Sequence, residues 1–507
     1  MLATLWSAAV RGVDGFLVRV EADLSNGLPC FTTVGLPGGA VREARERVVS
    51  AVRNAGFEFP DQRVVVNLAP AEQRKEGAHL DLPIALGVLA ASGQIEAKSW
   101  STGFCAFGEL ALDGSLRPVR GALALTLAAR ECGMRAALVP SANAAEAALT
   151  GLPVFGVGSL TEAAALLGDR ERPRRRLPSD ELPPPERPGS ACAYDLSDVR
   201  GQALARRALE ISAAGGHNLL MVGPPGSGKS MLARRLPGIL PPLGGDEALE
   251  VARIHSVAGL RAPSDGIPRE RPFRAPHATA STLSMIGGGP ACRPGEIVLA
   301  HRGVLFLDEL PEFRRGALEA LRQPLEDHSV TVTRVRDSIR FPADFSLVAA
   351  MNPCPCGRAG RVKNPCVCPE PSVRRYRNRV SGPMLDRFDL RIELAPLPFE
   401  DWNAPAAGEP SAAVRERVVA ARSRSSARLN RPGGNAGLTS AELRTLCPLG
   451  AGSLRLIESF VEGGKLSARG IDRILRVART LADLAGSASI EDPHVSEALF
   501  YRGYADP

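Results

Sequence analysis

The stretch Gly223-Pro-Pro-Gly-Ser-Gly-Lys-Ser230 fits the pattern G-x-x-x-x-G-K-[ST], which is typical of a loop that binds nucleotide phosphates. It follows an apolar run at 219–222 that is typical of a buried strand, and residues 231–236 after it have helical character. Backbone N–H groups of such a loop close around phosphates, the lysine reaches the β- and γ-phosphates, and the last hydroxyl binds Mg²⁺. The alternative is an ordinary glycine-rich turn, which the strand–loop–helix context disfavours. The predicted nucleotide-binding residues are Gly223, Pro224, Pro225, Gly226, Ser227, Gly228, Lys229 and Ser230.

Composition places the chain among ordinary globular proteins. Its 507 residues predict roughly two to four domains, and 44% hydrophobic with 23% charged residues is enough to build a sizeable core. No apolar run approaches the roughly 20 residues that span a bilayer, and Arg11, Asp14 and Arg19 do not suit a signal peptide. We therefore expect a cytoplasmic protein with no membrane partner. The net charge of +7 permits nucleic-acid binding, although a basic protein without a polyanion partner is the alternative.

The pattern of the chain divides it into four segments. Residues 170–190 combine proline with charge and have little to bury, which is typical of a linker. Before them, β-rich runs at 16–21 and 64–67 alternate with helical patterns at 41–55 and 82–91. After them, strands at 219–222, 303–307 and 345–350 alternate with helices, as in a parallel sheet, and a helical tail follows at 414–429, 440–447, 453–462, 468–485 and 491–500. The predicted segments are an N-terminal domain at 1–168, a linker at 169–190, a nucleotide-binding core at 191–395 and a helical domain at 396–507.

Two carboxylates stand at the end of a second apolar strand, in Gly303-Val-Leu-Phe-Leu-Asp-Glu309. Following a phosphate loop, this pattern predicts that Asp308 binds Mg²⁺ and that Glu309 polarises the attacking water. The next strand ends at Asn352, which we expect to contact the γ-phosphate or to orient that water. The alternative for Asn352 is a turn-forming residue before Pro353. These residues predict ATP hydrolysis with Mg²⁺.

At this point the sequence resembles the AAA+ ATPases, in the branch shared by magnesium-chelatase I subunits and MCM helicases, and most closely the Mg-chelatase-like ComM/YifB proteins. The resemblance covers nearly the whole chain. It implies an α/β protein with a ribosomal-S5/Lon-like N-terminal domain, an AAA+ core with a parallel sheet and a C-terminal helical lid. The motifs that carry it are Arg271-Pro-Phe-Arg-Ala-Pro-His277, Arg293-Pro-Gly-Glu-Ile297, Ala300–Phe313, Met351-Asn-Pro-Cys-Pro-Cys-Gly357 and Ser381-Gly-Pro-Met-Leu-Asp-Arg-Phe-Asp389.

The resemblance also implies roles for two arginines. Arg387 matches the arginine finger that acts on a neighbouring subunit's ATP, and Arg469 matches sensor 2, with Arg473 as a rival for that role. An arginine side chain is always positively charged, so its N–H groups can stabilise the negative charge that develops on the phosphates during hydrolysis. A finger used in this way requires a ring, so the implied assembly is a homohexamer. The alternative for each arginine is a surface salt bridge.

A basic hairpin is predicted just before the Asn352 strand. His328-Ser-Val-Thr-Val-Thr-Arg-Val335 alternates as a strand, Arg336-Asp337 can form the turn, and Ser338–Phe341 begins the return. Arg334, Arg336 and Arg340 would then lie near the tip. In the resembled family this hairpin points into the ring channel, where basic groups would follow the backbone of single-stranded or branched DNA. A sheet edge protected by charge is the alternative. A Gly-rich insertion at 278–296 resembles the helix-2 insert of the same branch.

Four of the ten cysteines lie within fifteen residues, as Cys354, Cys356, Cys366 and Cys368. Four thiolates suit a structural Zn²⁺, but this C-x-C spacing is tighter than the usual C-x₂₋₄-C, so reduced packing cysteines are the alternative. Residues 374–379 are rich in arginine. This pattern is equally consistent with a nucleic-acid contact surface and with a solvated helix face.

The N-terminal domain resembles Lon-type proteases without their catalytic pair. The position of the serine nucleophile falls near His79 and that of the lysine base near Leu123, and neither residue can do that chemistry. Peptidase activity is therefore not expected. The predicted function is an ATP-driven hexameric DNA motor, a helicase for branch migration in recombination or natural transformation. The alternative is a chelatase- or MoxR-like ATPase that remodels a protein partner.

Overall fold

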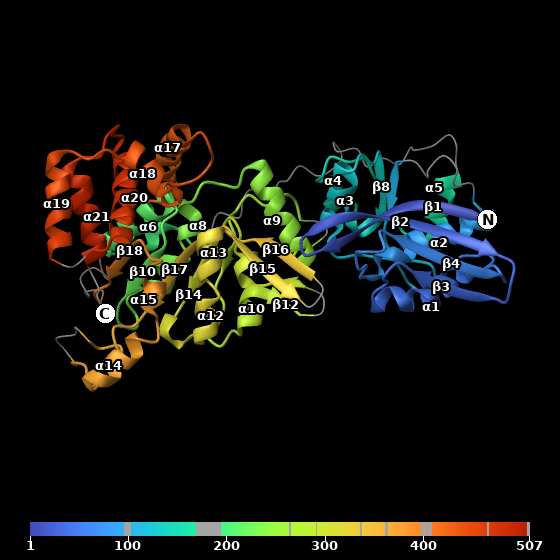
Figure 1. Cartoon of the computed structure of the whole chain (residues 1–507), viewed down its shortest axis with the longest axis horizontal. Coiled ribbons are helices and arrows are strands. Elements are labelled where there is room, and N and C mark those ends of the chain that lie inside the picture. The colour runs from blue at the N-terminus through green and yellow to red at the C-terminus, as the bar shows by residue number, and fades with distance from the viewer. Residues whose placement is uncertain are drawn as a thin grey trace.

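The computed structural model describes residues 1–95, 103–168, 194–262, 265–289, 292–334, 337–359, 364–396, 403, 408–463 and 466–503. Figure 1 shows an elongated molecule. One sheet-containing part lies at the N-terminal end, a second lies at the centre, and a helical part lies at the opposite end. The predicted linker at 169–190 lies outside the described residues.

The N-terminal part is built on a seven-stranded sheet of order β3-β4-β2-β1-β5-β8-β9. Its two longest strands, β1 and β2, pair antiparallel from Leu2↔Asp23 to Arg11↔Asp14. Helix α2 is buried on nearly every side, which explains why its sequence is apolar all round. The elements are β1 (Leu2–Arg11), β2 (Asp14–Ser25), β3 (Cys30–Val34), α1 (Gly39–Asn54), β4 (Arg63–Ala69), α2 (Asp81–Ala91), β5 (Phe104–Ala106), β6 (Glu109–Leu110), β7 (Leu116–Arg117), α3 (Ala122–Glu131), β8 (Ala136–Pro140), α4 (Ala144–Ala148), β9 (Val154–Val157) and α5 (Leu160–Gly168).

The central part is built on a five-stranded parallel sheet of order β11-β14-β17-β10-β18. The predicted parallel sheet is therefore confirmed. Its elements are α6 (Ala203–Gly215), β10 (Leu219–Val222), α7 (Lys229–Ala233), α8 (Leu236–Ile239), α9 (Gly245–Ala258), β11 (Phe273–Arg274), α10 (Thr282–Ile286), β12 (Gly287–Gly288), β13 (Arg293–Pro294), α11 (Glu296–Leu299), β14 (Val304–Leu307), α12 (Arg315–Glu319), α13 (Arg322–Asp327), β15 (Ser329–Arg334), β16 (Asp337–Pro342), β17 (Ser346–Met351), α14 (Glu370–Arg377), α15 (Gly382–Leu385) and β18 (Leu390–Glu393).

The helical end of the molecule contains α17 (Ser411–Leu429), α18 (Ser440–Leu446), α19 (Ala451–Glu462), α20 (Ala468–Ala485) and α21 (Asp492–Gly503). The predicted helical tail is confirmed. A buried polar chain ties this part to the sheet: His217 contacts Asp389 before β18 through Nδ1 at 3.2 Å, and Thr480 on α20 through Nε2 at 2.8 Å. Because buried polar groups need partners, this chain fixes α20 against the core.

Two local predictions were correct only in part. The helix expected at 231–236 stops at Ala233 and a new one begins at Leu236. Pro237 explains the break, because its ring would clash with the carbonyl of residue 233 in a continuous helix. The hairpin turn was expected at Arg336-Asp337, but Asp337 belongs to β16 and pairs with Arg334. This pairing keeps Val332 opposite Ile339, so that both apolar side chains share one face.

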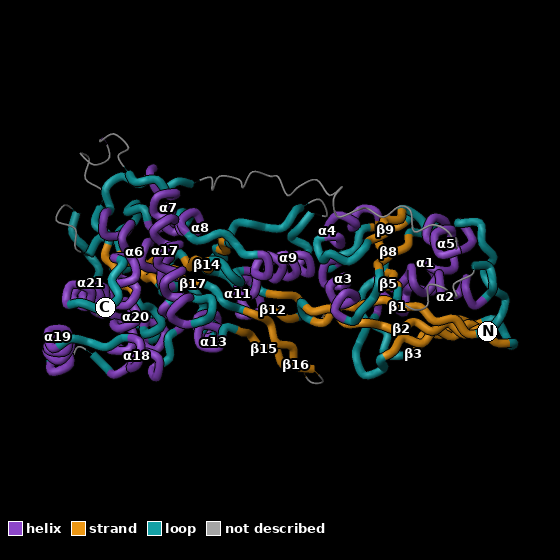
Figure 2. Tube along the Cα trace, turned by 90° about the horizontal axis from the view of Figure 1, so that it is seen from above, coloured by secondary structure: helices purple, strands orange, loops and turns teal. Residues whose placement is uncertain are grey.

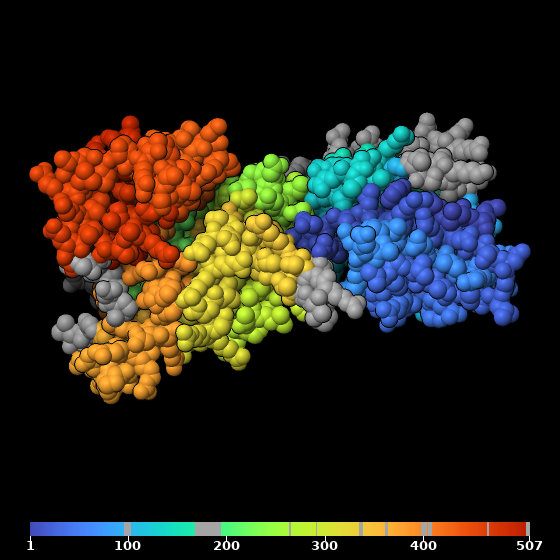
Figure 3. Space-filling view, viewed as in Figure 1, coloured from blue at the N-terminus to red at the C-terminus, as the bar shows by residue number. Residues whose placement is uncertain are grey.

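The turn between β1 and β2 inserts into the core of the central part. Val13 in this turn is 1% exposed and belongs to the same apolar cluster as Ile254, Met285 and Phe341. Asp14 also forms an ion pair with Arg253 on α9, with 2.8 Å between Oδ1 and Nη1. We call Gly12–Val13 the docking turn. The space-filling view shows the blue N-terminal part in contact with the green and yellow central part (Figure 3).

A second contact between the two parts involves α3 and α9. Leu123 and Leu127 of α3 are buried in one cluster with Ala252 of α9. Leu123 lies near the position that holds the catalytic lysine in the Lon-type proteases that this domain resembles. An amine there would have to be desolvated among apolar side chains, so the structure gives this position a packing role.

Candidate ATP site

The phosphate loop, Gly223–Ser230, connects the end of β10 to the start of α7. Three of its neighbours hold the ammonium group of Lys229, which donates to the carbonyls of Gly223 at 2.6 Å and Pro224 at 2.9 Å and to Asn352 Oδ1 at 3.2 Å. Lys229 is 8% exposed, and burial lowers its pKa, against the opposing charges of Asp308 and Glu309. The predicted lysine and the predicted sensor asparagine are therefore in direct contact.

Ser230 and Asp308 also meet. The Ser230 hydroxyl donates to Asp308 Oδ2 at 2.6 Å. Asp308 follows β14, whose four residues are all buried, so the strand fixes the carboxylate at the sheet edge. A serine hydroxyl beside a carboxylate is an oxygen donor set that suits Mg²⁺, which takes one or two protein ligands and keeps several waters. These two residues would hold the ion.

Glu309 differs from Asp308 in its backbone conformation. Its φ is 53°, in the left-handed region that non-glycine residues rarely adopt, and its N–H donates to Asp308 Oδ1 at 3.0 Å. The side chain is exposed beside the metal ligands. A free carboxylate in this position can polarise a water.

Sheet topology explains why these residues meet. Strands β14, β17 and β10 are parallel neighbours, so the residues after them gather at one edge. In open α/β sheets ligands bind outside the carboxyl ends of the strands. The structure thus places Lys229, Ser230, Asp308, Glu309 and Asn352 at the edge where that rule puts a nucleotide.

The three arginines of the resemblance lie elsewhere. Arg387 follows α15, is 15% exposed on its side chain, and forms an ion pair with Glu326 of α13. Arg469 is exposed on the first turn of α20. Its rival Arg473 is 8% exposed, and burial lowers its pKa, with Asp389 opposing that shift. The ion pair of Arg387 is with α13 and not with the phosphate loop of its own chain.

The basic hairpin projects from the body of the molecule (Figure 2). Val330, Val332, Ile339 and Phe341 face the core, whereas Arg340 and Thr331, which pair across the strands, are exposed. Arg336 lies outside the described residues, as does the side chain of Arg334. Of the three arginines predicted to contact DNA, only Arg340 can be placed, and it is on the outward face.

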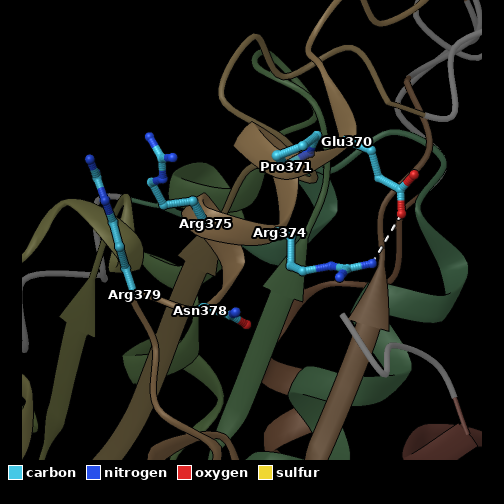
Figure 4. Close-up of a pocket in the computed structure, with 6 residues that line it drawn as sticks. All are labelled: Glu370, Pro371, Arg374, Arg375, Asn378 and Arg379. Carbon is cyan, nitrogen blue, oxygen red and sulfur yellow. Dashed lines mark hydrogen bonds and ion pairs between the residues drawn. The ribbon is translucent and has the colours of Figure 1, made fainter.

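Helix α14 carries an arginine-rich surface. A hollow of about 660 Å³ is lined by Glu370, Pro371, Arg374, Arg375, Asn378 and Arg379. Arg374 reaches Glu370 at 3.1 Å, whereas Arg375 and Arg379 extend to the other side (Figure 4). Arg379 pairs with Glu312 at 2.8 Å, so Arg375 contributes most of the uncompensated charge.

Sequence reasoning missed three groups around the site. The Gln202 side chain donates to Ser227 O at 3.4 Å and Ala395 O at 3.0 Å, which braces the phosphate loop. Tyr376 is buried, and Arg377 donates to Pro353 O at 3.2 Å, so α14 is attached behind Asn352. The only signal for Gln202 was its place after a glycine. Tyr376 and Arg377 lie in the arginine-rich stretch 374–379, but that pattern did not indicate their contacts.

In the N-terminal part, His79 is 7% exposed and burial lowers its pKa to about 4, so it is neutral at physiological pH. A neutral, buried histidine without a serine or lysine partner is no acyl-transfer site. Among the helices that the structure describes, none has the length and hydrophobicity to cross a membrane.

Comparisons with known proteins agree with this architecture. Three family models match: subunit ChlI of Mg-chelatase at residues 20–143, magnesium chelatase subunit ChlI at 195–402, and its C-terminal region at 408–502. Competence protein ComM of Haemophilus influenzae is 45% identical, over 99% of this chain and 97% of its own length. Protein YifB of Salmonella typhimurium is equally similar over the same shares. DNA repair protein RadA of Escherichia coli is 28% identical over 31% of this chain and 34% of its own length.

Three matched family models that span most of the chain, together with full-length relatives at this identity, establish its family. The chain belongs to the magnesium-chelatase-like AAA+ family that includes ComM and YifB.

Proposed function

We propose that this protein is an ATP-driven motor that assembles as a homohexamer and moves single-stranded or branched DNA, as in branch migration during recombination or natural transformation. The observation that carries the proposal is the ATP site at the sheet edge, combined with a projecting hairpin that exposes Arg340. The relatives ComM, a competence protein, and RadA, a DNA repair protein, support the choice of DNA.

In the proposed cycle, Lys229 exchanges its loop carbonyls for the β- and γ-phosphates of ATP. Ser230 and Asp308 would hold Mg²⁺, which would neutralise phosphate charge. Glu309 would polarise the attacking water, and Asn352, which contacts Lys229, would help to align it. This arrangement gives a role to each of the five polar residues described at that edge, namely Lys229, Ser230, Asp308, Glu309 and Asn352.

Arg387 would complete the site from another subunit, and Arg469 would act as sensor 2. Within its own chain Arg387 pairs with Glu326 of α13, which fits a role in trans. Arg387 would leave Glu326 and stabilise the transition-state charge of the neighbouring ATP, a contribution of about 10³ or more in kcat for arginine fingers.

Mixing two inactive variants tests this assignment. Lys229→Ala and Arg387→Ala should each lose ATP hydrolysis, and only Arg387→Ala should still bind ATP. In mixed rings, an intact loop meets an intact finger at about a quarter of the interfaces, because each partner is chosen at random. A steady-state ATPase assay on the mixture should therefore recover about a quarter of wild-type activity; no recovery would contradict a finger in trans.

Salt dependence tests the DNA contact. A protein that neutralises one phosphate fewer loses about one unit from the slope of log affinity against log salt. Arg340→Ala should show this loss on a fluorescent four-way junction. Arg455→Ala removes the same charge from an exposed site on α19 and should leave the slope unchanged. Equal slopes for both variants, or an ATPase that branched DNA does not stimulate, would argue against the motor.

A second candidate is a remodelling ATPase for a protein partner, favoured by the match to magnesium chelatase subunits. It predicts ATP hydrolysis that is indifferent to DNA, so the same junction experiment separates the two functions.

A further inference from the structure

The four cysteines of the cluster converge in space. Their Sγ atoms all lie within 4.8 Å of one another, and three of the separations are 3.4 Å for 354–356, 3.5 Å for 356–366 and 3.5 Å for 354–366. A tetrahedral ion with Zn–S bonds of about 2.3 Å places its ligands about 3.8 Å apart. The cluster is therefore close to the shape of a mononuclear site, and its separations exceed an S–S bond of about 2.0 Å.

Backbone groups support the sulfurs as ligands. Ala359 N–H donates to Cys354 Sγ at 3.2 Å, and Cys368 N–H donates to Cys366 Sγ at 3.4 Å. Such bonds stabilise thiolates and orient them, as the outer partners of metal ligands do. Only Cys354 is buried among the four, so apolar packing alone does not explain the convergence.

The cluster is attached directly to the ATP site. It begins two residues after Asn352, and Gly357 within it lies against Pro225 of the phosphate loop. A Cβ at position 357 would overlap Pro225 Cδ and lie 2.8 Å from Pro225 Cγ and 3.8 Å from Asn352 Cγ. On the other side, Arg377 of α14 bonds the carbonyl of Pro353 at 3.2 Å. The segment is thus wedged between the loop and α14.

From this geometry we propose that Cys354, Cys356, Cys366 and Cys368 hold one zinc ion, and that the metal-bound segment positions Asn352 and the phosphate loop for ATP hydrolysis. The second half of the proposal rests on the proposed ATPase function. Binding a metal orders the segment that carries its ligands, because the site does not exist in the disordered chain. Order in this segment would hold Asn352 on Lys229.

Metal content tests the site first. The full-length protein, purified without added metals or chelators, should contain one zinc per chain by mass spectrometry. Cys366→Ser and Cys368→Ser should lower this content severalfold, and Cys132→Ser, at an exposed cysteine outside the cluster, should not. Zinc below a fifth of an equivalent, or disulfides between the cluster cysteines in thiol titration, would overturn the site.

Kinetics test the positioning role. Misplacing a catalytic group by about 1 Å can cost about 100-fold, so the zinc-depleted variants should lose 10- to 100-fold in kcat, with KM for ATP changed less than threefold. Full kcat without zinc would overturn this role. A wild-type protein that holds zinc and hydrolyses no ATP would instead defeat the proposed function and leave the metal site standing.

Gly357 separates positioning from metal binding. Its φ is +72°, so Gly357→Ala adds both backbone strain and the overlap with Pro225. Gly133 has φ +77° with nothing near its Cβ position, so Gly133→Ala adds the strain alone. Gly357→Ala should keep its zinc and lose at least fivefold in kcat relative to Gly133→Ala. Equal kcat values would contradict coupling through Pro225.

Discussion

The docking turn allows a quantitative test of how the two sheet-containing parts are joined. Val13 is 1% exposed, in a cluster formed otherwise by residues of the central part. Val13→Ala removes two buried methyl groups at about 0.8 kcal/mol each, and the cavity left behind raises the loss to about 2–3 kcal/mol. A loss of about 2 kcal/mol corresponds to a docking constant about 30-fold weaker.

Hydrogen exchange followed by mass spectrometry reads out this change. Amides of β15, β16 and α9, which pack on the docking turn, should exchange about 30-fold faster in Val13→Ala, while α2 in the interior of the N-terminal part should be unaffected. Val34→Ala is the matched control, because Val34 is 41% exposed on β3 and its loss should change stability by less than about 0.5 kcal/mol. If the two variants exchange alike at β15 and β16, the turn is not docked in solution and the reasoning fails.

Two further predictions concern buried positions. Leu123→Lys places an amine in the apolar cluster with Ala252, so it should lower the melting temperature by several degrees and leave casein uncleaved; proteolysis by this variant would show that a Lon-like site survives. Glu250 has its pKa lowered to about 2, chiefly by the hydrogen bond with His301 and also by Arg302, from about 4.5 when unfolded. The ionised Glu250 therefore contributes its full stabilisation above pH 4.5, and this contribution is lost as the pH falls from 4.5 to 2. The melting temperatures of wild type and Glu250→Gln should converge as the pH falls through this window. A constant difference between the two melting temperatures would contradict the lowered pKa.

The residues that gather in the candidate ATP site could be selected from the sequence, because each of them belongs to a local pattern. A strand is recognised by its apolar run, and residues that follow parallel strands must meet at one edge. Asp308 and Asn352 could therefore be placed beside Lys229 before any coordinates. The exact ends of elements were less predictable: Pro237 divided one helix, and cross-strand pairing moved Asp337 out of the turn. The end of that helix and the start of that strand depend on which residues are neighbours in the folded chain.

Contacts between distant segments were beyond the sequence. Val13 is a single apolar residue in a turn and belongs to no periodic pattern, yet it packs with Phe341. Gly357 looked like part of a cysteine motif, and only the structure shows that it touches Pro225. A lone residue carries no signal for a partner more than a hundred positions away, because local propensity and hydrophobic period describe one element at a time.

Two of these distant contacts hold the N-terminal part on the central part. Leu123 of α3 contacts α9, and the docking turn supports the inner face of the basic hairpin, where Gly12 lies against Ile339. A Cβ at position 12 would come within 2.5 Å of Ile339 Cγ2, so the turn fits the hairpin closely. A hairpin held on its inner face presents Arg340 in a fixed direction. A charged lysine at position 123 would oppose the packing that brings α3 onto α9. The packing of α3 on α9 and the docking turn therefore belong to one interface, which also orients the hairpin.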